Sequence, residues 1–249
     1  MAKFKQAVVH WCFRDLTDAQ AKQIYDIGIT GVEMPPPEDY TKWLDRGFTI
    51  ATIGGHQTLR DGLNKTENHA RIADELRANL DVAQKLGIPN LICFSGDREG
   101  KSDEEGIANT IEGLRMVSKD AENAGVTLVM ELLNSKDHTD YQCDRTAWGV
   151  EVIKAVDSPR VKLLYDVYHM QRMEGEIIQN IRDNAEHFAH YHTAGNPGRN
   201  DLNAEQEIYY PAVARAIANT GYSGWVGHEF TTKNDPVEAL REAFEACSV

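Results

Sequence analysis

Four apolar stretches of the chain each end on, or just before, a side chain that can bind a metal ion. These side chains are Glu131, Asp166, His192 and Glu229. A carboxylate at the end of a buried strand must be paired with a positive charge or bound to a metal, because removing a bare charge from water is costly. Carboxylates together with an imidazole suit a divalent cation such as Mg2+, Mn2+ or Co2+. The pattern therefore predicts a single metal site without the thiolate ligands of many structural zinc sites.

Each of these residues also has an ordinary structural explanation. An acid at a strand end commonly caps the next helix or pairs with a basic side chain. Capping explains one such residue more easily than four on successive strands. Carboxylates gathered in one place also repel one another unless a cation lies among them. The metal site is therefore favoured over capping.

The elements that must position these residues alternate between strand and helix along the whole sequence. Strands are predicted at 7–13, 31–34, 48–53, 90–94, 127–131, 161–164, 188–192 and 224–229. Helices are predicted at 18–27, 38–45, 68–86, 104–123, 144–156, 174–186, 211–219 and 236–246. Strands that are apolar nearly throughout and are each followed by a helix indicate a parallel sheet buried on both faces.

At 249 residues, the pattern predicts one α/β domain, a (β/α)8 TIM barrel spanning residues 1–249. A doubly wound open sheet is the alternative, but no Gly-rich dinucleotide turn follows the first strand. Catalytic groups of such barrels lie at the C-terminal ends of the strands. Neighbouring strands lie about 4.8 Å apart. The four predicted ligands fall at the ends of the fifth to eighth strands, so they are expected to converge on one ion.

Residues near the same strand ends are candidates for binding substrate. His169 follows Asp166 by three residues and could contact a substrate oxygen, although core histidines show the same pattern. Arg199, after the seventh strand, could bind a carboxylate through two hydrogen bonds from its planar guanidinium, although loop arginines are usually solvated. His56, after the third strand, could line the same C-terminal end of the barrel.

Other residues of the region rank below these. Glu207, Tyr209 and Trp11 are weaker candidates for the site. Strand alternation is expected to turn His190 and His228 away from the barrel interior.

The composition limits the partners. Asp and Glu number 39 against 26 Lys and Arg, a net charge of -13 that argues against a non-specific nucleic-acid surface and fits small polar substrates. The 4 cysteines are spread without a CxxC pair, so neither a disulfide framework nor a structural zinc site is expected. No apolar run approaches the roughly 20 residues that span a bilayer, and no signal peptide is evident. A cytoplasmic protein without a membrane partner is expected, either a monomer or a homo-oligomer.

At these residues the sequence resembles the hydroxypyruvate isomerase family, within the xylose isomerase-like TIM-barrel superfamily. The segments that carry the resemblance are 165–176, 196–199, 207–210 and 221–230. It implies that the four predicted ligands hold the metal, that Glu131 and Glu229 also move protons, and that His169 and Arg199 lie at the substrate. His192 departs from the glutamine common in these isomerases and matches the related ketose 3-epimerases. Residues 203–206 replace an expected Gly-Thr-Gly run, and 56–68 also differ.

The predicted chemistry is the isomerisation of an α-hydroxy carbonyl compound. A divalent ion chelating both oxygens stabilises the enediolate, and two carboxylates act as base and acid. The expected reaction converts hydroxypyruvate to 2-hydroxy-3-oxopropanoate (tartronate semialdehyde) through a cis-enediolate. A 2-oxo-tetronate isomerase or a ketose 3-epimerase would use the same metal site. An apurinic endonuclease would need more ligands and a basic groove, and a non-catalytic sugar-acid binding module would not need paired glutamates.

Overall fold

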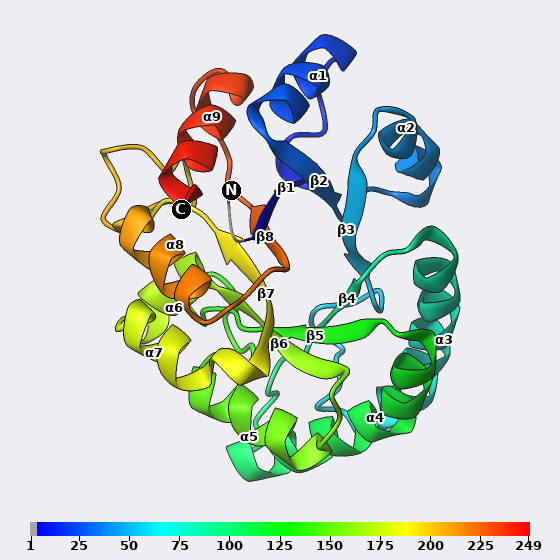
Figure 1. Ribbon diagram of the computed structural model, residues 1–249. Helices are drawn as coiled ribbons and strands as arrows, with labels where there is room; N and C mark the ends of the chain where they lie inside the picture. Colours follow the sequence, from blue (N-terminus) through cyan, green and yellow to red (C-terminus); the bar gives the residue numbers. More distant parts are fainter. Residues whose placement is uncertain (1–3) are drawn as a thin grey trace. The chain divides into compact units, whose positions relative to one another are not determined.

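The strands of the computed structural model, which describes residues 4–249, follow one another in chain order in a closed parallel barrel. The strands are β1 (Lys5–Val9), β2 (Ile29–Glu33), β3 (Thr49–Gly54), β4 (Asn90–Cys93), β5 (Thr127–Glu131), β6 (Val161–Asp166), β7 (Phe188–Thr193) and β8 (Trp225–His228) (Figure 1). The predicted (β/α)8 TIM barrel is confirmed.

Helices follow the strands along the chain. They are α1 (Asp18–Ile27), α2 (Tyr40–Asp45), α3 (His69–Leu86), α4 (Asp103–Ala124), α5 (Thr146–Val156), α6 (Val167–Met173), α7 (Ile177–Asn184), α8 (Tyr210–Asn219) and α9 (Pro236–Cys247). None of the helices within residues 4–249 is both long and apolar enough to cross a bilayer.

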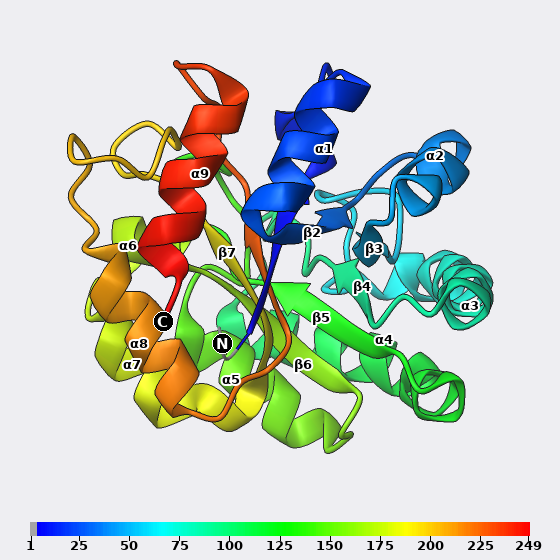
Figure 2. The same cartoon turned by 45° about the horizontal axis from the view of Figure 1, so that its top comes forward.

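The chain forms two compact units. The first comprises residues 1–51, 176–185 and 190–249, of which 1–3 lie outside the described part. In this unit β1 pairs in parallel with both β2 and β8, and β7 pairs with β8. Helix α1 packs beside α9, and α7 beside α8 (Figures 1 and 2). Ala7, Ala51 and Trp225 form a buried apolar cluster.

Gly31 permits the close approach of β2 to this cluster. A Cβ atom at Gly31 would lie 2.5 Å from Cζ3 of Trp225 and 2.7 Å from the Cβ of Ala7. Any larger residue would therefore push the indole ring or the neighbouring strand aside.

The second unit comprises residues 52–175 and 186–189. Its strands pair in sequence, β3 with β4, β4 with β5 and β5 with β6, all in parallel. Helices α3 and α4 pack side by side, as do α4 and α5 (Figure 2). The strands consist mainly of buried apolar residues, which the sequence pattern predicted.

The largest differences from the sequence prediction lie in two segments. The first strand ends at Val9 rather than Phe13, because the chain turns into a short 3-10 helix in which the Phe13 N–H bonds the His10 carbonyl at 3.0 Å. Helix α6 was not predicted. It begins directly after β6, where the Asp166 side chain accepts the backbone N–H of His169 at 2.9 Å and caps the helix.

Candidate metal centre

The four predicted metal ligands lie at the C-terminal ends of their strands. Glu131 and Asp166 are the last residues of β5 and β6. His192 lies one position before the end of β7, and Glu229 directly follows β8. Their side chains are all buried. Glu131 and Asp166 belong to the second unit, and His192 and Glu229 to the first.

In the first unit, Glu229 is held by three side chains. The indole N–H of Trp11 donates to Oε1 at 2.9 Å. Oε2 lies 2.9 Å from Nδ1 of His192 and 2.7 Å from Nη2 of Arg199. The Arg199 guanidinium also stacks on Trp11, 5.3 Å from the ring centroid. Burial alone would favour a protonated Glu229, but the charges of Arg199 and His192, together with hydrogen bonds from His192 and Trp11, lower the pKa of its carboxyl.

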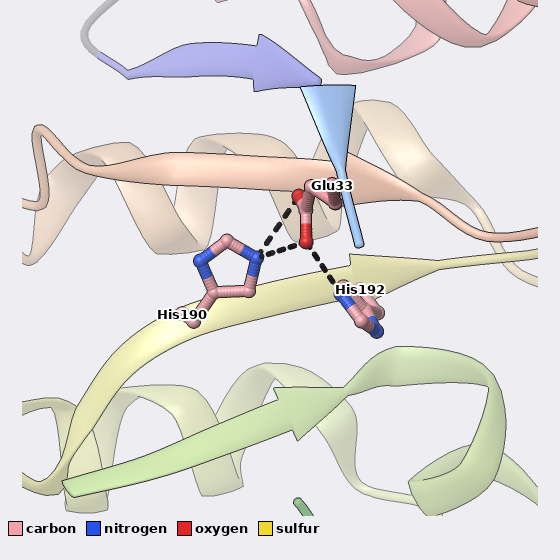
Figure 3. Close-up of side chains that lie close together, drawn as sticks. All are labelled: Glu33, His190 and His192. Atoms are coloured by element: carbon pink, nitrogen blue, oxygen red, sulfur yellow. Dashed lines mark hydrogen bonds and ion pairs between the residues drawn. The ribbon is translucent and has the colours of Figure 1, made fainter. Parts of the chain in front are cut away.

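His192 has a second carboxylate neighbour on the other side of its ring. Figure 3 shows Glu33, at the end of β2, reaching toward two histidines of β7. Its Oε2 lies 3.0 Å from Nε2 of His192 and 2.9 Å from Nε2 of His190. We call Glu33, His190 and His192 the Glu33 cluster.

The Glu33 side chain is ionised despite complete burial. Burial opposes its ionisation, but the two histidines lower the pKa of the carboxyl from 4.5 to about 2. An anion buried in this way needs several donors, and the imidazoles supply them.

Strand alternation was expected to turn His190 away from the barrel interior, but His190 lies on the same side of β7 as the predicted ligand His192. Residues two apart on a strand point to the same side, and both imidazoles contact Glu33. His228 points elsewhere, with Nε2 2.8 Å from Oε1 of Gln6 and Nδ1 2.8 Å from Oγ1 of Thr193.

In the second unit, Asp166 and His169 are adjacent and fully buried. Nε2 of His169 lies 3.9 Å from Oδ2 of Asp166. The backbone N–H of Asn134 donates to Nδ1 of His169 at 3.2 Å. Because Nδ1 accepts this bond, a neutral His169 carries its proton on Nε2, the nitrogen on the Asp166 side.

The loop after β5 is tied to α6. Asp137 accepts hydrogen bonds from the Tyr168 hydroxyl at 2.8 Å and from Arg172. At the base of the same loop, the Tyr141 hydroxyl donates to the Glu131 carbonyl at 2.9 Å. Burial opposes ionisation of Asp137, but these donors and Asn134 lower its pKa from 3.8 to about 2. The loop thereby positions the backbone around both Glu131 and His169.

His56 also belongs to the second unit and is 5% exposed. The Phe94 N–H donates to its Nε2 at 2.9 Å. Within residues 4–249, its buried Nδ1 has no hydrogen-bond partner. Burial lowers the pKa of His56 to about 4. A neutral His56 therefore carries its proton on the buried Nδ1.

The lower-ranked candidates divide into two groups. Trp11 contacts Glu229 and lines a cavity of about 340 Å³ in the first unit. Glu207 accepts a hydrogen bond from Asn196 at the surface, and Tyr209 is 68% exposed. Sequence reasoning missed Glu33, although it too is an acid that ends a strand.

The buried carboxylates and imidazoles have the chemistry of a cation site. Groups of such side chains in this chain could hold a metal ion. Oxygen and imidazole donors without thiolates fit Mg2+, Mn2+ or Co2+.

Comparison with known proteins adds to this geometry. The model of the family described as xylose isomerase-like TIM barrel matches residues 21–248. Hydroxypyruvate isomerase of Escherichia coli K12 is 31% identical over 169 residues, which cover 68% of this chain and 65% of that protein. A 2-oxo-tetronate isomerase of Cupriavidus necator is 29% identical over 49% of this chain and 47% of its own length.

A solved structure shares the fold across nearly the whole chain. The crystal structure of AP endonuclease, family 2, from Brucella melitensis superposes with a TM-score of 0.84 at 24% identity, covering 96% of this chain and 97% of that one. At this identity the likeness concerns the fold alone.

Proposed function

Because the chain belongs to the xylose isomerase-like TIM barrel family, we propose that it is a metal-dependent isomerase of a small hydroxy-keto acid. The proposed reaction converts hydroxypyruvate to 2-hydroxy-3-oxopropanoate. The observation that carries this proposal is the set of buried acids and imidazole at the ends of β5 to β8. The relatives named hydroxypyruvate isomerase and 2-oxo-tetronate isomerase support the reaction class.

In this proposal one divalent cation would be held by Glu131, Asp166, His192 and Glu229. The donor set fits, because hard oxygen ligands and one imidazole match Mg2+, Mn2+ or Co2+. When bound, such a cation supplies Lewis-acid polarisation of the substrate carbonyl and a template for the neighbouring hydroxyl.

The protein's own residues would move the protons. One glutamate removes a proton from the carbon beside the carbonyl, and the other delivers a proton to the adjacent carbon, through a cis-enediolate. We assign these roles to Glu131 and Glu229. Trp11 and Arg199 support Glu229 in its ionised form through the contacts at 2.9 Å and 2.7 Å.

Arg199 would also select the substrate. A guanidinium binds a carboxylate through two parallel hydrogen bonds, whereas a neutral ketose offers no such anion. His169 and His56 would contact the substrate's oxygens. This assignment favours a keto acid over the ketoses used by 3-epimerases.

A metal and substrate screen tests the proposal. Protein stripped with a chelator is reloaded with Mg2+, Mn2+ or Co2+ and assayed in D2O with hydroxypyruvate, 2-oxo-tetronate and ketoses. We expect metal-dependent turnover of the keto acids, with solvent deuterium in the product. The Glu112→Gln variant, which neutralises an exposed acid, should match the wild type.

Other results would redirect the assignment. Turnover of ketoses alone would indicate a 3-epimerase. Cleavage of abasic DNA would indicate an endonuclease. Tight binding of a keto acid without turnover would leave only a binding module.

A further inference from the structure

The Glu33 cluster lies outside the proposed ligand set but touches one of its members. The Glu33 side chain is completely buried at the end of β2. Its carboxylate contacts His190 at 3.0 Å and 2.9 Å and His192 at 3.0 Å, in each case through Nε2 (Figure 3). A buried acid with two imidazole partners has a structural cost that a purely apolar residue would avoid.

The hydrogen-bond roles in this cluster follow from the atom types. A carboxylate accepts hydrogen bonds and has no N–H to give, so the Nε2 atoms of both histidines donate. When a cation takes the place of the proton on Nδ1, a His192 ring that donates from Nε2 offers its Nδ1 lone pair to that cation. Nδ1 is also the atom that faces Glu229, at 2.9 Å from Oε2.

A metal-binding histidine needs its lone pair on the nitrogen that faces the ion. A carboxylate that accepts the other N–H fixes both the tautomer and the ring orientation. Given the metal site of the proposed function, on which this step rests, we infer that Glu33 is a positioning residue that holds His192 with Nδ1 toward the cation.

The strand β8 makes room for this contact. An added Cβ at Gly227 would lie 2.2 Å from Oε1 of Glu33 and 2.9 Å from Cδ2 of His192. Gly227 is paired with His192 across the β7–β8 ladder. A side chain at this position would push the carboxylate away from the imidazole, so a glycine here preserves the contact between Glu33 and His192.

A second use of the same residues is a metal site of its own, because Glu33, His190 and His192 offer three potential ligand atoms close together. In that case the Nε2 atoms would bind a cation rather than donate to Glu33. The number of ions bound per chain separates this arrangement from the positioning role.

The test is a calorimetric Mn2+ titration of chelator-stripped protein. The Glu33→Gln variant keeps the size of the side chain but removes its charge. We expect one ion per wild-type chain and a dissociation constant 10- to 100-fold higher in Glu33→Gln, about the effect of losing a histidine's carboxylate partner. The matched control is Gln6→Met, which removes the acceptor 2.8 Å from Nε2 of another buried histidine, His228. The control should bind Mn2+ with the wild-type dissociation constant.

A second measurement reports on the ring itself. Nitrogen NMR of metal-free protein should show His192 protonated at Nε2 in the wild type and in Gln6→Met, and a mixture of tautomers in Glu33→Gln. Gly227→Ala should shift the dissociation constant in the same direction as Glu33→Gln, without altering either residue's chemistry.

Three outcomes overturn the inference. An unchanged dissociation constant and tautomer in Glu33→Gln would reject the positioning role and leave the proposed function standing. Two ions per wild-type chain, one of them lost in Glu33→Gln, would make the cluster a metal site. Failure of the wild type to bind any Mn2+ would reject the proposed function together with the inference.

Discussion

The contacts of Glu229 suit the two roles proposed for it, metal binding and proton transfer. Trp11 donates to one carboxylate oxygen at 2.9 Å, while His192 and Arg199 lie at 2.9 Å and 2.7 Å from the other. These neighbours hold the ionised form in a buried position, where a base is poorly solvated and its contacts are strong. The carboxylate is therefore both oriented and charged before the substrate arrives.

The Glu229→Gln variant tests the proposed proton-transfer role. The amide has the shape of the carboxylate but cannot accept the substrate's proton, so kcat should fall about 10²- to 10⁴-fold. Exchange of deuterium from D2O into the product should fall with it. Circular dichroism serves as the folding control, and a variant with wild-type kcat would show that another group moves the proton.

His56 gives a pH-dependent contribution to stability. Burial lowers its pKa from 6.5 to about 4 in the folded state, so the folded chain binds fewer protons than the unfolded chain between these values. The contribution is fully present above pH 6.5 and is lost as the pH falls toward 4. It amounts to about 3 kcal/mol.

Urea unfolding at pH 7 and pH 4.5 measures this effect. The free energy of unfolding of wild-type protein should fall more between the two pH values than that of His56→Gln. Identical pH dependence in both proteins would mean that His56 is not the titrating group.

The pattern used to predict the site residues, an acid directly after an apolar run, does not detect every buried acid. Glu131 and Asp166 follow apolar runs, so an acid after such a run was recognisable from sequence. Glu33 follows Ile-Thr-Gly-Val, whose threonine and glycine interrupt the apolar pattern, so it was passed over. Its contacts with β7 depend on pairing between distant segments, which a local pattern does not contain.

At the scale of elements, α6 and the loop after β5 form a connected unit. Asp137 binds Tyr168 and Arg172, and Asp166 caps the helix that carries both. The stretch following β6 was recognised as a site motif, and its helical form was missed, since the seven residues Val167–Met173 are too short for a clear apolar stripe.

The Asp137→Ala variant tests this connection. It removes an ionised acceptor that is partly exposed, so we expect a loss of about 1–2 kcal/mol in the free energy of unfolding. Asp183→Ala is the matched control, because that exposed residue accepts a hydrogen bond from Gln179 of its own helix at 2.8 Å. Equal changes in the two variants, measured by urea titration, would rule out the anchoring role of Asp137.

Most other elements followed from the sequence, and the reason is physical. Strands buried on both faces read as short apolar runs, and long helices show a stripe and a terminal glycine. Helix α1 was predicted with its observed bounds, Asp18–Ile27, between a threonine cap and Gly28. Boundaries moved where local turns intervened, as after Val9.

At the scale of the whole molecule, the family establishes the barrel but not the chemistry. Proteins with the same fold catalyse unrelated reactions, so the function depends on the residues of the site. The fold was predictable because eight strand–helix repeats in 249 residues leave few alternatives. That residues 1–249 act as one domain stays a prediction.

Metal binding should stabilise the folded chain as a whole. A cation that binds only the folded state adds about 2.7 kcal/mol to the free energy of unfolding at a concentration of 100 times its dissociation constant. Thermal melts with and without Mn2+ measure this. In Asp166→Asn the amide can still cap α6, but the lost charge should abolish the stabilisation by metal. A full Tm shift in that variant would exclude Asp166 as a ligand.

The most direct test of the central claim is to reload stripped protein with Mn2+ while following bound metal and hydroxypyruvate isomerisation in the same samples. The account predicts that activity rises in proportion to bound metal and saturates at one ion per chain. Full activity in the stripped protein, or activity that does not follow occupancy, would contradict it.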